Sequence, residues 1–503
     1  MDQLLRRVFN AHVIDVLPEP TGLDRATILS ARFGRDVWIK REDLTPVFSF
    51  KLRGAYNRMV QLGEAERRAG VIAASAGNHA QGVAYGARLL GIRARIVMPR
   101  TTPSIKVEAV RRLGAEIDLA GDDYTSAAAH CATLVAETGM TPVPPYDHPD
   151  VIAGQGTIGL ELLHQAPRDL GSIFVPVGGG GLAAGVASVV KELRPHVQVW
   201  GVQPHDSDAM ARSLRAGTRV VLDHVGLFAD GVTVKQVGEH TFPLCQRYLD
   251  GILTVGVDEI CAAIRDVFQD TRSVLEPAGA LSIAGMKQAA WAGTLPPGPV
   301  VVVASGANMN FARLGYVAER AEVGEHREAI LAVTIPERPG AFLEFCGVIG
   351  ARSVTEFNYR LASRAEAHIF VGVEVTGVDE ARALAGELGS RGYACVDLSD
   401  NDLAKTHVRH MVGGRTLEVR DEVLFGVEFP ERPGALMQFL TSLGARWNIS
   451  LFHYRNHGAA TGRVLCGVEV PPAERAELRE RLDRLGFPYA DESDNPAGRF
   501  FLA

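Results

Sequence analysis

Short apolar runs alternate with longer amphipathic stretches between about residues 36 and 310. The apolar runs are rich in valine and isoleucine and read GVIAASAG, RARIVMP, AEIDLAG, SIFVPVGGG, VQVWGVQP and PVVVVASG. The stretches between them predict helices, and in PSIKVEAVRRLG the apolar positions at helical spacing are Ile105, Val107, Val110 and Leu113. Buried strands that alternate with helices predict an α/β fold with mostly parallel sheets, in which ligands bind at the carboxyl ends of the strands.

The pattern changes after the polar segment ERAEVGEHREA at residues 319–329, and a repeat appears. IPERPGAF at 335–342 recurs as FPERPGAL at 429–436, and each copy continues in parallel, as GARSVTEFNYR and GARWNISLFHYR. The order strand, Pro-Gly turn, helix, strand, strand, helix predicts an α+β unit that occurs twice. We expect an α/β body over 1–325, a first α+β unit over 328–402, a connecting segment over 403–422 and a second unit over 423–503.

Composition narrows the functional class. The 503 residues are 47% hydrophobic and 22% charged, and the net charge of −7 includes no basic block, which favours a small-molecule ligand over nucleic acid. No apolar run approaches the ~18 residues of a membrane span, and the N-terminus does not resemble a signal peptide, so we expect a cytoplasmic protein without a membrane partner. The six cysteines are scattered without a CxxC pair, so we predict free thiols and no metal site.

The segment GGGGL follows a predicted strand and precedes a predicted helix. The backbone N–H groups of such a loop and the helix N-terminus together favour a phosphate group. A tight turn is the structural alternative. A dinucleotide site would need an acidic residue about 20 positions later, and an NTP-binding loop would need a GKS/T lysine; the sequence has neither. The predicted phosphate-binding residues are Gly178, Gly179, Gly180, Gly181 and Leu182.

Two further strand-to-helix turns carry polar side chains. In ASAGNHAQG, Ser75 and Asn78 either cap the helix or bind a ligand, and His79 is better explained as a structural histidine than as a base. In ASGANMN, Ser305 is either a turn serine or a ligand contact at the end of a strand.

The lysine of SFKLRGA is the remaining candidate. An isolated lysine is usually a solvated surface charge. Lys51, however, lies between Phe50 and Leu52 in a sheet protein that has a predicted phosphate site. A desolvated lysine can form a Schiff base with an aldehyde. A Schiff-base lysine and a phosphate loop are the pair of features that pyridoxal phosphate requires.

Several ordered motifs carry a family resemblance over roughly residues 5–320. KREDLTPVFSFKLRGA, SAGNHAQGVA, GGGGL, EPAGA and SGANMNF resemble the fold-type II pyridoxal-phosphate enzymes of the threonine/serine dehydratase family. The two ERPGA copies, with KTHVRHMVGGR between them, resemble the ACT-like regulatory domain of the biosynthetic threonine dehydratases. The resemblance implies a two-subdomain catalytic domain similar to the tryptophan synthase β subunit, followed by a duplicated regulatory domain.

The resemblance also implies a role for each candidate. Lys51, with Phe50 beside it, would hold pyridoxal phosphate and then take the α-proton of the substrate. Asn78 would contact the ring hydroxyl, the loop from Gly178 to Leu182 the phosphate, and Ser305 the ring nitrogen. A neutral serine beside that nitrogen favours β-elimination over transamination. The substrate carboxylate would lie in the loop formed by Ser75, Ala76, Gly77, Asn78 and His79. Serine racemases of the family carry a serine at position 76 as a second base, so Ala76 disfavours racemisation.

The implied reaction converts L-threonine, and also L-serine, to a 2-oxoacid and ammonia, with isoleucine as feedback inhibitor, valine as its antagonist and a homotetramer as the assembly. Candidate effector contacts are Tyr359, Arg360, Tyr454 and Arg455, although each Pro-Gly turn could equally serve only the fold. The alternatives are a serine dehydratase or another pyridoxal-phosphate β-eliminase or β-replacement enzyme, and an amino-acid sensor with an inactive catalytic domain.

Overall fold

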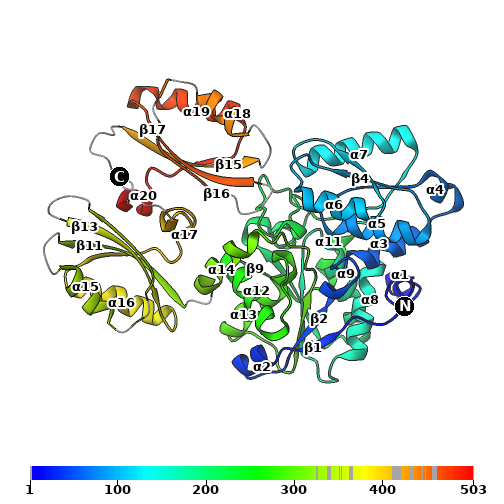
Figure 1. Ribbon diagram of the computed structural model, residues 1–503. Helices are drawn as coiled ribbons and strands as arrows, with labels where there is room; N and C mark the ends of the chain where they lie inside the picture. The colour runs from blue at the N-terminus through cyan, green and yellow to red at the C-terminus, as the bar shows by residue number, and fades with distance from the viewer. Residues whose placement is uncertain are drawn as a thin grey trace. The chain divides into compact units, whose positions relative to one another are not determined.

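The computed structural model divides into two compact units, Met1–Val317 and Ala318–Ala503 (Figure 1). It describes residues 3–324, 327–336, 341–350, 352, 354–361, 366–410, 421–430, 435–443, 446–447, 449–455 and 461–501. The division falls within helix α14 (Arg313–Gly324), slightly before the boundary expected at residue 325.

Residues 3–317 form two sheets, one of six strands in the order β1-β2-β10-β7-β8-β9 and one of four in the order β5-β4-β3-β6. Neighbouring strands are parallel except β1, which runs antiparallel to β2, and this confirms the predicted α/β fold with mostly parallel sheets. The strands are β1 Leu23–Arg25, β2 Val37–Arg41, β3 Val71–Ala74, β4 Ala94–Met98, β5 Glu116–Leu119, β6 Thr141–Pro142, β7 Ser172–Pro176, β8 Gln198–Pro204, β9 Gly251–Val255 and β10 Val300–Ala304.

Helices connect these strands, as crossovers between parallel strands require. They are α1 Gln3–Phe9, α2 Thr27–Phe33, α3 Lys51–Val60, α4 Glu64–Ala69, α5 Asn78–Leu90, α6 Ser104–Arg112, α7 Tyr124–Thr138, α8 Pro149–Gln165, α9 Gly181–Leu193, α10 Ala209–Ala216, α11 Thr241–Tyr248, α12 Val257–Thr271 and α13 Pro277–Trp291, with short 3-10 turns η1 Glu42–Leu44, η2 His205–Ser207 and η3 Asp230–Val232. Helix α3 packs against both α5 and α8, so the two sheets meet at the helix that begins with Lys51.

One apolar residue of the predicted helical pattern is not in the core. On α6, Val107 and Val110 are buried, whereas Ile105 is 58% exposed. Ile105 lies two residues before Val107, and side chains two positions apart in a helix point to nearly opposite faces. The prediction of one apolar face that includes Ile105 was therefore wrong at that position.

The second unit contains the expected repeat. The first copy has β11 Glu328–Pro336, α15 Ala341–Ile349, β12 Val354–Leu361, β13 Glu366–Glu374, α16 Val378–Ser390 and β14 Ala394–Asp397. The second has β15 Glu422–Pro430, α18 Ala435–Leu443, β16 Ile449–Arg455, β17 Thr461–Glu469, α19 Arg475–Leu485 and β18 Tyr489–Asp491. The closing strands β14 and β18 extend the predicted order by one strand in each copy. Segments α17 Asp402–Thr406, η4 Val408–His410, η5 Pro472–Glu474 and α20 Pro496–Phe501 complete the unit.

Each copy forms an antiparallel sheet, in the orders β12-β13-β11-β14 and β16-β17-β15-β18. Alternate residues of β11 enter different cores: Leu331 and Val333 pack with the helices of their own copy, while Ile330 and Ala332 join a cluster that also includes Leu465 of the other copy. Strand side chains alternate between the two faces of a sheet, so one strand serves both cores. The ERPG turns at 337–340 and 431–434 lie outside the described residues.

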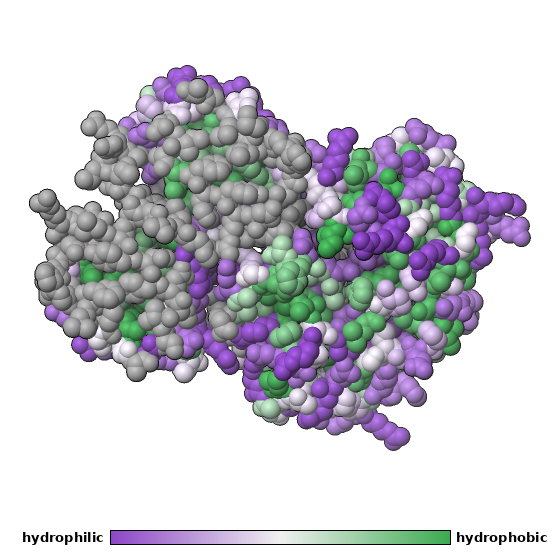
Figure 2. Space-filling model, in the orientation of Figure 1, coloured by the Kyte–Doolittle hydropathy of each residue, from purple (hydrophilic) through white to green (hydrophobic). Residues whose placement is uncertain are grey.

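Hydrophilic side chains cover much of the first unit on the face shown in Figure 2, with apolar side chains scattered among them. Within the part of the chain that the structure describes, no helix is both long enough and apolar enough to span a bilayer.

Candidate active site

Lys51 is the first residue of α3, at the junction of the two sheets. Its Nζ donates a hydrogen bond to the carbonyl oxygen of Pro145 at 2.7 Å and lies 5.3 Å from the centre of the Phe50 ring. Burial lowers the pKa of Lys51 to about 8, and the negative charge of Glu276 opposes part of that shift. The side chain therefore has the desolvated environment that nucleophilic lysines require.

The glycine loop joins the end of β7 to the start of α9. A Cβ on Gly179 would lie 2.3 Å from the Tyr146 ring, and one on Gly178 would lie 2.9 Å from the Cα of Val232. Gly180 has a φ of +98°, which side chains with a Cβ rarely adopt, and a Cβ there would lie 2.7 Å from Met210 Cε. The loop therefore requires glycine for steric and conformational reasons, and it presents backbone at the N-terminus of a 13-residue helix.

Pro145 and Tyr146 place Lys51 near this loop. Lys51 Nζ is hydrogen-bonded to Pro145, and the next residue, Tyr146, lies against Gly179 and Gly181. The lysine and the predicted phosphate loop, which are more than 120 residues apart in the sequence, thus contact adjacent residues of one segment.

Asn78 does not cap helix α5. The cap residue is Gly77, without a side-chain cap hydrogen bond, while the Ser75 hydroxyl accepts a hydrogen bond from the Gly77 N–H at 3.3 Å. The Asn78 amide nitrogen donates to Glu276 Oε1, and its Oδ1 accepts from Asn308 Nδ2 at 2.7 Å. Asn78 therefore belongs to a polar cluster within the site.

His79 is buried, and its Nε2 makes a 2.7 Å hydrogen bond with the Val143 carbonyl oxygen. Burial, together with the nearby charge of Lys51, lowers the pKa of His79 to about 3, so the ring is neutral. The Nε2 contact is that of a structural histidine, while the buried Nδ1 of the ring has no hydrogen-bond partner within the described residues. Ala76 lies in the same turn and is half-buried.

Ser305 follows β10 and is buried. Its hydroxyl is 3.4 Å from the Ala278 carbonyl oxygen, and its own carbonyl accepts the Phe50 N–H at 3.1 Å. A bridge between Ser49 and Gly306 joins the same two segments. The strand end that carries Ser305 is thus attached directly to the residues that precede Lys51.

Two polar residues of the candidate site were missed by the sequence reasoning. Glu276, the first residue of the EPAGA motif, is buried beside Gly306, and a Cβ on Gly306 would lie 2.6 Å from its Oε1. Burial, and secondarily the charge of Asp230, raise the pKa of Glu276 to about 7. Asn308, in SGANMNF, donates to both Val47 and Asn78. Both lie in motifs that carried the resemblance, which was the available signal, but a motif does not identify hydrogen-bond partners.

An ion pair joins the two sheets of the first unit. Lys106 Nζ on α6 lies 2.5 Å from Asp230 Oδ2, and Arg313 lies 3.6 Å from the other carboxylate oxygen. Burial opposes ionisation of Asp230, but these two cations outweigh it and lower its pKa. Asp230 follows Ala229 in the segment ADGV, and among the described residues no group of three or more His, Cys, Asp or Glu side chains could hold a metal ion.

The four candidate effector residues lie on corresponding strands of the two copies. Tyr359 and Arg360 are on β12 and pair with Ile369 and His368, while Tyr454 and Arg455 are on β16 and pair with Val464 and Arg463. Their side chains are outside the described part of the structure, so their predicted role stays a prediction.

Comparison with known proteins decides the family. A family model described as pyridoxal-phosphate dependent enzyme matches residues 14–306, and one described as the C-terminal regulatory domain of threonine dehydratase matches residues 319–408 and again 413–502. The chain is 55% identical to the biosynthetic L-threonine dehydratase IlvA of Burkholderia multivorans, over 99% of each chain. It is 52% identical to that of Escherichia coli, over 100% of this chain and 97% of the relative. The chain belongs to the biosynthetic threonine dehydratase family.

Membership in this family confirms the predicted fold type II catalytic domain with a duplicated regulatory domain. Among solved structures, the processed form of threonine deaminase isoform 2 from Solanum lycopersicum is similar, with a TM-score of 0.62 and 46% identity over 63% of this chain and 92% of that chain. The chain is a pyridoxal-phosphate-dependent enzyme, as predicted.

The residues present fit pyridoxal phosphate. Lys51 offers a desolvated amine, and the loop from Gly178 to Leu182 offers backbone that carries no side chain at its four glycines, at the positively polarised end of α9. Ser305 offers a neutral hydroxyl, and Asn78 an amide held by two partners. Among the described residues, the hydrogen-bond partner of Ser305 Oγ is a backbone carbonyl and not a carboxylate.

Proposed function

We propose that this chain converts L-threonine to 2-oxobutyrate and ammonia, with pyridoxal phosphate held covalently at Lys51, as the regulated entry step of isoleucine synthesis. The observation that carries the proposal is the position of Lys51: its Nζ is desolvated, and it contacts the segment that packs on the glycine loop. The relatives' names supply the substrate, since they are threonine dehydratases.

The amine of Lys51 acts as the base for the α-proton. Pyridoxal phosphate supplies an electron sink that makes the α-proton of a bound amino acid acidic. With a pKa of about 8, roughly one Lys51 in ten is unprotonated at pH 7, against roughly one in three thousand at the ordinary value of 10.5. Burial thus raises the fraction of competent base by more than two orders of magnitude.

The turn from Ser75 to Asn78 orients the substrate. It leads into α5, a 13-residue helix whose first N–H groups carry no side-chain cap, and such groups bind carboxylates. The methyl side chain of Ala76 in this turn can neither donate nor accept a proton, and burial keeps the His79 ring neutral. Lys51 is therefore the base on which proton removal depends, which suits elimination rather than racemisation.

The duplicated regulatory domain leads us to propose that effectors control the rate of threonine turnover. We expect isoleucine to bind the duplicated unit and to lower threonine turnover, and valine to oppose it, with the effector near β12 and β16. We also expect a homotetramer that acts in the cytoplasm. The support for effector control is the family's regulatory domain, matched over both copies.

A lysine substitution tests the catalytic proposal. Lys51→Ala is expected to lower 2-oxobutyrate formation from threonine by at least about 10³-fold, because both the covalent attachment and the base are lost. The matched control is Lys235→Ala, at an exposed lysine, which should retain wild-type turnover. Wild-type activity in the Lys51 variant would overturn the proposal.

Substrate competition separates threonine from serine. We expect a larger kcat/KM for L-threonine than for L-serine, measured separately as 2-oxobutyrate and pyruvate. A strong preference for serine would favour the serine dehydratase alternative instead.

A further inference from the structure

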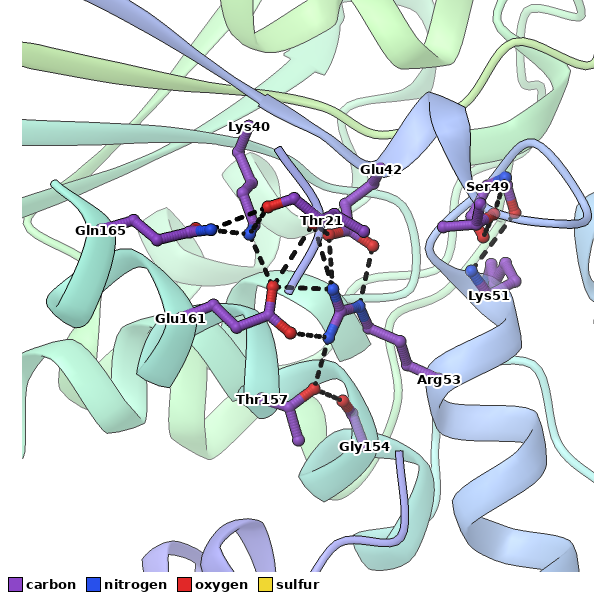
Figure 3. Close-up of polar contacts among 11 residues, drawn as sticks. Thr21, Lys40, Glu42, Ser49, Lys51, Arg53, Gly154, Thr157, Glu161 and Gln165 are labelled. Atoms are coloured by element: carbon purple, nitrogen blue, oxygen red, sulfur yellow. Dashed lines mark hydrogen bonds and ion pairs between the residues drawn. The ribbon is translucent and has the colours of Figure 1, made fainter. Parts of the chain in front are cut away.

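A buried cluster of four charged side chains lies beneath the first turn of α3 (Figure 3). It contains Lys40 on β2, Glu42 in η1, Arg53 on α3 and Glu161 on α8. The side chains of Lys40, Glu42 and Arg53 are 0% exposed, and that of Glu161 is 15% exposed. Two positive and two negative charges balance, so the cluster is neutral as a whole.

Arg53 is at the centre of the cluster and uses all of its guanidinium nitrogens. It pairs bidentately with Glu42, through Nε and Nη2 at 2.8 Å each, and bidentately with Glu161, through Nη1 at 2.5 Å and Nη2 at 2.9 Å. Further hydrogen bonds reach Thr157 Oγ1 at 3.0 Å and Thr21 Oγ1 at 3.2 Å. The planar fork of arginine fixes direction as well as charge, which a lysine ammonium does not.

Lys40 completes the cluster from the side of β2. Its Nζ donates to the Thr21 carbonyl oxygen at 2.8 Å, to Glu161 Oε2 at 2.6 Å and to Gln165 Oε1 at 2.7 Å. All three ammonium protons are thereby used. Strand β2 and helix α8 are thus connected to the same carboxylate that holds Arg53.

Arg53 lies two residues after Lys51, so the two side chains leave the helix on nearly opposite sides. The turn between them is held closely on both faces. A Cβ on Gly54 would lie 2.4 Å from Gln155 Nε2 on α8, and one on Gly82 of α5 would lie 3.2 Å from the Lys51 carbonyl group. The first turn of α3 therefore has little room to shift while Arg53 remains paired.

The position of this cluster is better explained by a role in orienting the first turn of α3 than by a contribution to the stability of the fold. Removing two ion pairs from water costs several kcal/mol per ion, and apolar residues of similar volume often replace buried ion pairs without loss of stability. A neutral, fully paired cluster directly behind Lys51 instead specifies one position of the helix turn. The inference rests on the proposed function, because it assumes that Lys51 carries the cofactor.

We propose that Arg53 is a positioning residue for Lys51: its bidentate contacts with Glu42 and Glu161 hold the first turn of α3 so that Lys51 Nζ stays in its desolvated position beside Pro145.

The test uses the full chain freed of cofactor and then mixed with pyridoxal phosphate, with Schiff-base formation followed by absorbance as a function of pH. The wild type is expected to show a midpoint near pH 8, the pKa of the partly buried Lys51 amine. Arg53→Lys keeps the charge balance but loses the fork. Water then reaches Lys51 Nζ, and the midpoint rises by about one pH unit. Threonine kcat falls about tenfold, while KM stays within about threefold.

Lys287→Met provides the matched control. Lys287 is as deeply buried as Arg53 and pairs with Asp266, which keeps its pair with Arg32. This variant should lower Tm without moving the midpoint. Glu42→Gln is the milder second variant: it leaves one carboxylate on the Arg53 fork and should shift the midpoint in the same direction by less.

The outcomes are distinct. A lowered Tm in Arg53→Lys with an unchanged midpoint and kcat would show that Arg53 serves stability only. Wild-type behaviour in every readout would show that charge alone suffices, and either result overturns the inference while leaving the proposed function intact. If the wild type itself forms no Schiff base, the proposed function fails instead.

Discussion

Two ionisable residues in the site have pKa values moved toward neutrality by the same cause. Burial disfavours the charged form of each, so it lowers the pKa of Lys51 to about 8 and raises that of Glu276 to about 7. The protein thus contains an amine that is partly deprotonated near pH 7 and a carboxyl that is about half protonated there. Shifts of this size are typical of functional sites.

Glu276 gives a pH-dependent stability prediction. Its folded pKa lies above the ordinary value of 4.5, so the folded state holds a proton that the unfolded state has released, and stability falls as pH rises from about 4.5 to about 7. Glu276→Gln removes this penalty. We expect the variant to gain roughly 1–3 kcal/mol relative to wild type between pH 5 and pH 8.

The measurement is the Tm of both cofactor-free proteins at pH 5 and pH 8. Asp266→Asn is a suitable control, since Asp266 is equally buried but forms ion pairs with Arg32 and Lys287. An identical Tm difference between wild type and Glu276→Gln at both pH values would contradict the raised pKa.

The sequence could single out Lys51, Asn78 and Ser305 as candidates because each lies in a motif at the end or start of a predicted element. It could not identify the hydrogen-bond and ion-pair partners of the side chains in and around the site. The Arg53 side chain contacts residues from three separate segments, and Glu276 contacts Asn78 from almost 200 residues away. Periodicity carries no information about pairing between charges on different elements, so buried ion pairs require the structure.

At the scale of elements, the glycine loop between β7 and α9 gives the sharpest prediction. Gly180→Ala combines a φ of +98° with a Cβ 2.7 Å from Met210 and 2.9 Å from Thr241. The loop must shift to relieve this, so the affinity for pyridoxal phosphate should fall at least about tenfold, equivalent to about 1.4 kcal/mol.

Gly139→Ala separates backbone strain from loop displacement. Gly139 has a φ of +69° at the end of α7, but a Cβ there meets nothing within 4 Å. It should cost about 1 kcal/mol of stability without changing cofactor affinity. The measurement is a titration of the cofactor-free Gly180→Ala and Gly139→Ala variants with pyridoxal phosphate. Equal affinities of the two variants would show that the glycine loop tolerates a methyl group at position 180.

The six valine-rich runs were all predicted correctly as strands, because a buried parallel strand has a continuous apolar sequence bounded by turn residues. Strands β1, β2, β6 and β9 of the first unit and the closing strands β14 and β18 were not predicted. Strands β14 and β18 are short and mostly exposed, so they lack the apolar signal. Ile105 shows the opposite error, an apolar residue on the exposed side of a helix.

At the scale of the whole molecule, the second unit contains a charged centre formed by its own residues. Asp402, at the start of α17, pairs with Arg320 at 3.0 Å and with Arg463 at 2.5 Å. Arg320 is on α14, and Arg463 is on β17 of the second copy. One carboxylate therefore connects three elements of the regulatory unit.

We expect Asp402→Asn to weaken inhibition by isoleucine about threefold or more while basal threonine turnover stays unchanged. Each pair contributes up to about 1 kcal/mol to the arrangement of the three elements, and we expect effector binding to depend on that arrangement. The measurement is an isoleucine titration of threonine turnover. Asp494→Asn, at an exposed pair with Arg499, is the control. Unaltered inhibition in Asp402→Asn would separate this centre from regulation.

The repeat was visible in the sequence because the PERPGA motif and the segments after it recur, and the family match over both copies agrees with this. The cluster shared by the two copies was not visible, since it requires alternate residues of β11 to face a different sheet. Which copy binds an effector depends on side chains that the sequence pattern does not place.

The central claim is that Lys51 carries the cofactor, and chemical trapping tests it most directly. The purified protein is loaded with pyridoxal phosphate, reduced with borohydride and digested, and the modified peptide is located by mass spectrometry. We predict one modified residue, Lys51, and its protection from reduction when threonine is being turned over. Stable labelling of another lysine, or of none, would contradict the account.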